Sequence, residues 1–185
     1  MEKLLYLVHR IPYPPNKGDK IRSFNFLRTL AQEYEIYLGA FVDDPEDWKY
    51  SEELNRYCQE IKLLPLDSRR AKLHSLKGFL SGAPLTLPYY TNREMQRWVE
   101  QVTIEQGIDR VLVFSSAMAQ FVEAKRFSSC CRVIDFVDAD SDKWRQYAES
   151  KQWPMSWVYR REWQTLLDYE RRVAKLFDSS LFVSA

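Results

Sequence analysis

The stretch HRIPYPPNKGDKIRSFNFLRTLAQ follows the apolar run LLYLV and contains side chains suited to anion binding. Gly18 allows a ligand to approach the backbone closely, and Asp19 is a candidate N-cap of the helix that follows. Lys20 and Arg22 fall in the first turn of that helix, where cations oppose the helix dipole unless an anion binds there. This arrangement indicates phosphate binding at a helix N-terminus.

The same loop departs from two well-known phosphate-binding motifs. It contains no G-x-G-x-x-G sequence, and no second glycine or GK[ST] sequence accompanies Gly18. Two interpretations therefore stay open. One is a phosphate-binding loop of another kind, and the other is a proline-rich turn that leads into a capped helix without any ligand.

The acidic run DADSD follows the apolar segment RVIDFV and forms a second candidate group. Its first residues resemble a calcium-binding loop, but Lys143 stands where that loop needs a glycine, so calcium binding is disfavoured. Asp138 lies just beyond the end of a predicted strand, and Asp140 follows two residues later. These carboxylates either face a ligand cleft or cap the next helix.

Ser115, Ser116 and His9 also follow predicted strands. A catalytic triad is disfavoured, because the chain has no G-x-S-x-G sequence and its only histidines are His9 and His74. The two serines are expected to cap a helix that points into the cleft, where they can meet ligand hydroxyl groups. His9 is either a hydrogen-bonding group of the cleft or a packed residue at the strand end.

The segment RRAKLHSLKGFL is basic and amphipathic. A helix of this kind can lie on an anionic membrane surface. The alternative is that its apolar stripe packs on the domain while its cations are solvated. The cations concerned are Arg69, Arg70, Lys72 and Lys77.

Apolar runs and helical patterns alternate along the chain, and they define the elements that position these residues. The runs are typical of strands buried on both faces of a parallel sheet. Their alternation with helices predicts an α/β fold, a Rossmann-like doubly wound, mainly parallel sheet with helices on both faces. The expected strands cover residues 4–8, 36–42, 61–66, 110–114, 132–137 and 180–184.

Helical spacing predicts the elements between the strands. A helix over residues 19–33 is expected to pack a stripe that includes Ile21, Phe24 and Leu27 on the sheet. A short helix is expected around residues 54–58. Two helices are expected in residues 67–107, and two more after RVIDFV, with Pro154 near the start of the second.

Length and composition limit the class of protein. The chain has 185 residues, which suits one domain, and its 27 Lys and Arg nearly balance 26 Asp and Glu, so the charge gives no sign of a nucleic-acid partner. Three cysteines without a CxxC or Cys/His cluster argue against disulfides and zinc and indicate a reducing cytoplasm. No apolar run reaches the roughly 18 residues of a membrane span.

A family resemblance covers essentially the whole chain. The opening LYLVHRIPYPPNKGDKIRSFNFLRTLAQEYEIYLGAFVDD resembles that of family 4 glycosyltransferases of the GT-B fold. SSAMAQF, VIDFVDADSDKW and LDYERRVAKLFDSSLFVSA, in this order, resemble the sugar transferases associated with PEP-CTERM exopolysaccharide systems. The resemblance implies that residues 1–185 are the Rossmann-like N-terminal, acceptor-side domain of a retaining, hexosyltransferase-type enzyme in exopolysaccharide biosynthesis. The donor-binding C-terminal domain, with its E-x7-E motif, is expected beyond Ala185, so this chain alone should be inactive.

The resemblance also implies ligands and residue roles. The donor is a nucleotide-diphosphate sugar, the acceptor is a saccharide or a lipid-linked acceptor, and neither a metal nor another cofactor is required. Asp138 takes the catalytic position at which many relatives have the histidine of a His-Asp pair. Donor phosphate is expected at Gly18, Asp19, Lys20 and Arg22, the acceptor at His9, Tyr13, Ser115, Ser116 and Asp140, and an anionic membrane, at the inner face of the plasma membrane, at Arg69, Arg70, Lys72 and Lys77.

Two other classes of protein fit the same residues. One is a non-catalytic Rossmann-like binding module for a phosphorylated ligand, and the other is a nucleotide-dependent enzyme of another family. Titration with nucleoside diphosphates and an assay for sugar transfer separate these classes from a transferase.

Overall fold

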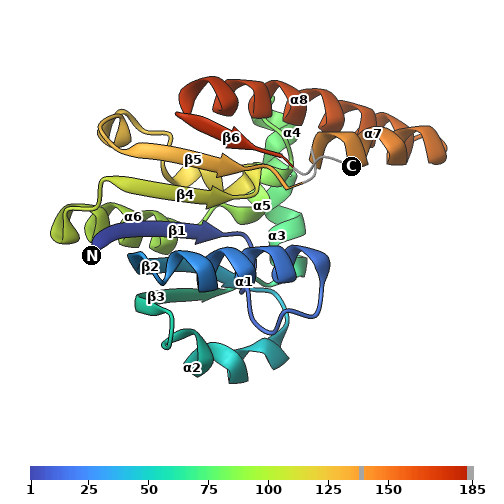
Figure 1. Cartoon of the computed structure of the whole chain (residues 1–185). Coiled ribbons are helices and arrows are strands. Elements are labelled where there is room, and N and C mark those ends of the chain that lie inside the picture. Colours follow the sequence, from blue (N-terminus) through green and yellow to red (C-terminus); the bar gives the residue numbers. More distant parts are fainter. Residues whose placement is uncertain (138–139, 183–185) are drawn as a thin grey trace.

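Six parallel strands form one sheet in the computed structural model, which describes residues 1–137 and 140–182 (Figure 1). The strand order is β3-β2-β1-β4-β5-β6, and every neighbouring pair is parallel. This is the strand order of a doubly wound nucleotide-binding sheet, so the predicted Rossmann-like fold is confirmed. The strands are β1 (Glu2–Val8), β2 (Tyr34–Val42), β3 (Cys58–Pro65), β4 (Arg110–Phe114), β5 (Cys131–Asp135) and β6 (Ser179–Leu181).

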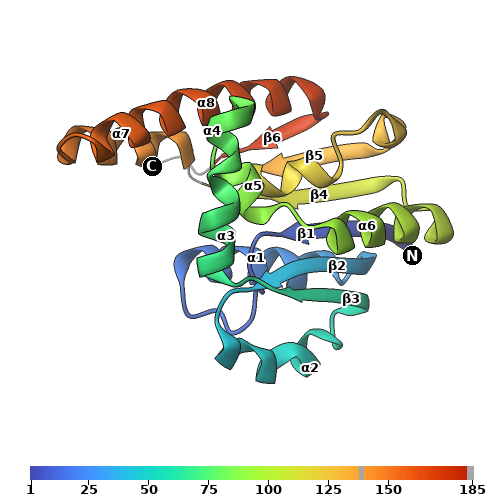
Figure 2. The same ribbon diagram turned by 180° about the vertical axis from the view of Figure 1, so that it is seen from behind.

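Helices cover both faces of the sheet, and the central strands β1, β2 and β4 bury side chains on both of their faces. Along β1, Leu5 and Leu7 belong to one apolar cluster, and Tyr6 and Val8 belong to the other. Figures 1 and 2 show α1 over one face and α6 over the opposite face. The helices are α1 (Gly18–Leu30), α2 (Ser51–Leu54), α3 (Ser68–Ser75), α4 (Lys77–Ser81), α5 (Thr86–Tyr90), α6 (Arg93–Gln106), α7 (Asp140–Ser150) and α8 (Met155–Leu176), with 3-10 turns at Pro45–Tyr50, Ser116–Phe121 and Lys125–Phe127.

The buried face of α1 differs from the predicted stripe by one residue at its start. Phe24 and Leu27 are buried as expected, but Ile21 is 46% exposed, and Lys20 and Ser23 are buried instead. Lys20 tolerates burial because its Nζ lies 2.5 Å from Oδ2 of Asp47. The ion pair therefore sets the rotation of the helix against the sheet.

Other expected elements have different bounds in the structure. Residues 67–107 contain four helices rather than two, because α3 and α4 are separate and a left-handed Gly82 ends α4 before α5. The helix expected around residues 54–58 is limited to α2, and Cys58 already begins β3. The last strand is shorter than expected, and residues 183–184 lie outside the described part of the chain.

A membrane-spanning helix requires a long apolar segment. None of the helices in residues 1–137 and 140–182 combines the length and the apolar character that crossing a membrane requires.

Candidate functional site

A cavity of about 1110 Å³ lies at the carboxyl edge of the sheet, where the strand order reverses between β1 and β4. His9 directly follows β1 and Ser115 directly follows β4, and both line it. Ligands of doubly wound sheets bind at this switch point. The first turn of α1 and the helices α3, α5, α7 and α8 supply the remaining walls.

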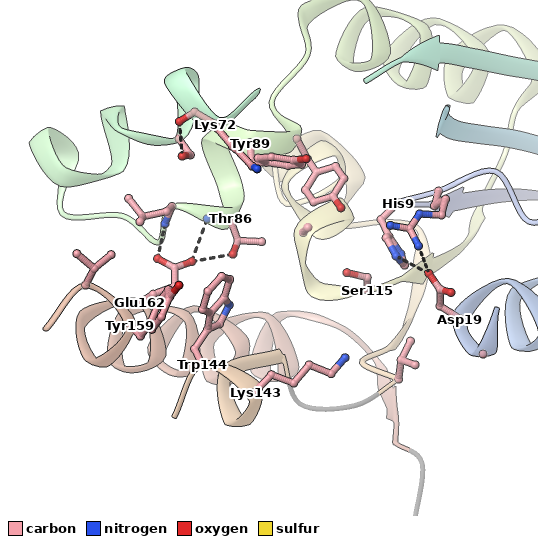
Figure 3. A pocket seen from close by; sticks show the side chains of 18 of the residues that line it. His9, Asp19, Lys72, Thr86, Tyr89, Ser115, Lys143, Trp144, Tyr159 and Glu162 are labelled. Atoms are coloured by element: carbon pink, nitrogen blue, oxygen red, sulfur yellow. Dashed lines mark hydrogen bonds and ion pairs between the residues drawn. The ribbon is translucent and has the colours of Figure 1, made fainter. Parts of the chain in front are cut away.

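A network of charged side chains closes the β1 side of the cavity (Figure 3). Oδ2 of Asp19 lies 3.3 Å from Nε2 of His9 and accepts a hydrogen bond of 3.0 Å from Arg10. Arg10 also reaches Asp43 at 2.9 Å. The hydrogen bond from His9 and the charge of Arg10 hold the pKa of Asp19 well below its ordinary value, despite partial burial. Asp19 is therefore an ionised carboxylate that fixes the two residues after β1.

Arg22 is held at the cavity by a carboxylate inside the sheet. Asp135, the last residue of β5, is fully buried, and its Oδ2 accepts a hydrogen bond of 2.8 Å from Nε of Arg22. Its other oxygen accepts a hydrogen bond of 2.8 Å from the Val137 backbone N–H. Because both oxygens are engaged, Asp135 gives the Arg22 guanidinium a defined position one turn into α1.

Two residues with a strained backbone line the cavity. Ser115 has φ of 81° and Val137 has φ of 63°, values that residues with a side chain rarely adopt. Ser115 is held by its backbone N–H, which donates to the Asp135 carbonyl at 2.8 Å. Strain of this kind concentrates at ligand sites, since a structure retains it only where the surroundings enforce it.

The opposite wall is aromatic, and one buried carboxylate organises it (Figure 3). Glu162 of α8 accepts hydrogen bonds from the backbone N–H groups of Leu85 and Thr86 at 2.6 and 3.0 Å, and from the Thr86 hydroxyl at 2.7 Å. These bonds satisfy donors at the start of α5 and join that helix to α8. Trp144 and Tyr159, whose ring centroids lie 5.4 Å apart, also line this wall.

The structure brings together five of the residues predicted for donor or acceptor binding. Gly18, Asp19, Arg22, His9 and Ser115 all line the cavity. Apart from Gly18 itself, its two chain neighbours and the backbone of α1, no heavy atom of the described residues lies within 4 Å of the position that a Gly18 β-carbon would take. A ligand can therefore approach the backbone at the N-terminus of α1.

Asp19 and Ser115 do not cap helices as predicted. Helix α1 begins at Gly18, so Asp19 lies inside its first turn and pairs with Arg10 instead of capping. Ser115 precedes only a short 3-10 turn, and its side chain makes no capping bond within the described residues.

Three predicted site residues lie elsewhere. Lys20 is buried against Asp47, so its charge is neutralised inside the protein and the predicted phosphate contact is wrong. Tyr13 packs on Phe24, with ring centroids 5.2 Å apart, away from the cavity lining. Ser116 is buried, and its hydroxyl has no partner among residues 1–137 and 140–182.

The remaining predicted site residues belong to the acidic run and the basic segment. Asp138, the predicted catalytic residue, lies outside the described residues. Asp140 begins α7, and its side chain is also outside the described part. Of the four cations predicted to contact a membrane, Lys72 lines the cavity, and all four are exposed on α3 and α4, at Arg69, Arg70, Lys72 and Lys77.

Sequence reasoning missed several residues that line or support the cavity. Asp135 had a readable signal, because a carboxylate inside the apolar run RVIDFV needs a partner when it is buried. Glu162 and Arg10 had no such signal, since their partners are set by packing between distant segments. Within the described residues, no group of three or more His, Cys, Asp and Glu side chains is placed to hold a metal ion.

A scan of the chain against models of known protein families gives no match, and a search of curated proteins also gives none. The family resemblance of the sequence therefore stays a prediction. The function has to be argued from the cavity itself.

Proposed function

We propose that the chain is the acceptor-side domain of a retaining glycosyltransferase that uses a nucleotide-diphosphate sugar in exopolysaccharide biosynthesis. The observation that carries this proposal is the cavity at the switch point, with the open Gly18 backbone and the fixed Arg22 on one wall. The resemblance of the sequence to family 4 glycosyltransferases supports the choice of reaction.

Transfer from such a donor requires stabilisation of the departing diphosphate. Backbone N–H groups and cations held in place before the reaction provide it, because they need no reorganisation as charge develops. The N-terminus of α1 supplies the first, and Arg22, positioned by Asp135, supplies the second. Both would face the diphosphate across the cleft, while a second, donor-binding domain would hold most of the nucleotide.

The size and lining of the cavity suit an acceptor beside the donor sugar. Ligand pockets have volumes of roughly 300 to 1000 Å³, so this cavity of about 1110 Å³ is large enough for a sugar-sized ligand. The ring faces of Trp144 and Tyr159 offer apolar surfaces, and the Ser115 and Thr86 hydroxyls offer polar contacts for a saccharide. We place the enzyme in the cytoplasm, at the inner face of the plasma membrane.

A sugar-transfer assay tests the transferase. This domain combined with a donor-binding domain should transfer sugar from a nucleotide-diphosphate donor, and residues 1–185 alone should not. Turnover by residues 1–185 alone contradicts the division of labour between the domains. Binding of a nucleoside diphosphate without sugar transfer, even with a donor-binding domain present, favours the binding module for a phosphorylated ligand.

A further inference from the structure

Helices α3 and α4 turn their leucines toward solvent. Leu73, Leu76 and Leu80 follow each other at spacings of three and four residues, so they share one side of the helical segment. They are 70%, 53% and 91% exposed, whereas Ala71 and Gly78 are buried. The alternative that the stripe packs on the domain therefore does not hold for these three leucines.

The same segment is strongly basic. No Asp or Glu occurs between Ser68 and Ser81, and four cations, Arg69, Arg70, Lys72 and Lys77, surround the exposed leucines. Arg70 pairs with Asp67, the N-cap of α3, across an exposed contact of 3.4 Å. The cations therefore keep a positive field around an apolar stripe.

A second element extends this surface. Trp153 and Trp157, at the start of α8, are 81% and 56% exposed, and the Trp157 ring stacks on Phe79 of α4 with centroids 6.1 Å apart. Arg161 joins the two elements, because it donates hydrogen bonds to the carbonyls of Gly78 and Ala83 at 2.7 and 3.1 Å. Figure 2 shows α4 against α8 at the rim of the molecule. The residues between Lys151 and Arg161 also include no acid.

We propose that the face formed by α3, α4 and the start of α8 docks on an anionic lipid surface. Exposed leucines can enter the apolar region, tryptophans favour the boundary between headgroups and acyl chains, and surrounding cations pair with anionic headgroups. An apolar protein partner fits less well, because four cations around the stripe would have to be paired or desolvated in the interface. The charge pattern therefore selects an anionic lipid surface as the occupant.

This face borders the cavity. The link between the two rests on the proposed function. Lys72 and Ser75 of α3 and Met155 of α8 line the cavity and belong to the elements of the face. A headgroup attached to the lipid surface can thus reach the cavity without leaving that surface. Of the two acceptor classes that the resemblance implies, this arrangement favours the lipid-linked one.

Vesicle sedimentation tests the docking face with the 185-residue chain. Wild type should bind vesicles that contain phosphatidylglycerol and should bind pure phosphatidylcholine weakly, with an affinity that falls as salt is raised. Replacing Arg69, Arg70, Lys72 and Lys77 by Gln should lower the affinity about a hundredfold or more. The matched control replaces four exposed cations elsewhere, Arg28, Lys49, Arg56 and Arg171, by Gln and should bind much more tightly than the first variant.

A second variant separates lipid docking from other uses of the face. Leu76→Ser with Leu80→Ser removes apolar side chains that are already in solvent, so the fold should persist while vesicle binding weakens. Equal binding to neutral and anionic vesicles, equal loss in the control, or a wild-type dimer that this variant dissociates would overturn the proposal. Because vesicle binding needs no nucleotide, it can hold even if sugar transfer fails, and the reverse also applies.

Discussion

Helices α1 and α3 are both basic, but their cations lie in different environments. Lys20 of α1 is paired with Asp47 inside the protein, and Arg22 is held by the buried Asp135. Arg69 and Lys77, in contrast, lie on the exposed surface of α3 and α4. Carboxylates thus fix Lys20 and Arg22 in space, whereas Arg69 and Lys77 lie in contact with solvent.

This difference indicates different tasks for the two segments. A fixed guanidinium recognises a ligand at one position, because its geometry is set before the ligand arrives. Exposed cations contribute a field that salt screens within about 10 Å, and each pair is worth little on its own. We therefore expect substitutions around α1 to affect stability and ligand affinity, and those on α3 and α4 to affect only charge-dependent binding.

The largest effect is expected from Asp47→Ala. It leaves Lys20 buried without a counter-charge, which should lower the free energy of unfolding by about 3 to 5 kcal/mol. Urea unfolding measures this loss. Replacing both residues, with Lys20→Met and Asp47→Leu, should restore most of the stability. Arg70→Ala on α3 is the contrasting variant and should change stability by less than about 0.5 kcal/mol.

A smaller effect is expected from Asp135→Asn. The amide keeps the shape of the side chain but removes the charge that holds Arg22, and the half-exposed guanidinium can turn to water. Stability should fall by about 2 kcal/mol, and the affinity for a nucleoside diphosphate should fall by about tenfold. Titration calorimetry on Asp135→Asn and on Lys72→Gln compares two of the cations that line the cavity, Arg22 and Lys72. An equal or larger loss in Lys72→Gln would contradict the positioning role of Asp135.

The smallest effect concerns acid stability. The pKa of Asp19 is lowered in the folded state by His9 and Arg10, so its carboxylate stabilises the fold fully above its unfolded pKa of about 4. This contribution is lost as the pH falls toward the lowered folded value. Between pH 5 and pH 2, the free energy of unfolding should therefore fall less steeply with decreasing pH for Asp19→Asn than for wild type. Parallel curves would show that the His9 and Arg10 contacts do not stabilise the ionised form.

The strands of the sheet were predictable because burial on both faces requires continuous apolar runs, as in LLYLV and IYLGAFV. The position of the cavity was predictable for the same reason, since a parallel sheet places the ends of β1 and β4 together. The rotation of α1 was not predictable, because an ion pair with Asp47 buries Lys20 where the pattern favoured Ile21.

The aromatic wall of the cavity also could not be predicted from the sequence. Glu162 bonds to Leu85 and Thr86 across 76 or 77 residues of chain, and no local spacing indicates such a contact. The exposure of Leu73 and Leu80 was equally undetermined, because an amphipathic pattern does not tell which side of the helix faces the protein. Tertiary packing decides both features.

Calorimetric titration with nucleoside diphosphates tests most directly whether the N-terminus of α1 is the phosphate site. Wild type should bind at least one of UDP, GDP and ADP, and Gly18→Val should lower that affinity at least about tenfold, because the new side chain fills the open space beside the backbone. The melting temperature should change by less than about 3 °C, since no described atom outside the chain neighbours of Gly18 and the α1 backbone lies within 4 Å of that position. The control Arg28→Gln, at the other end of the same helix, should bind like wild type. Equal affinity in Gly18→Val, or no binding by wild type, would contradict the site.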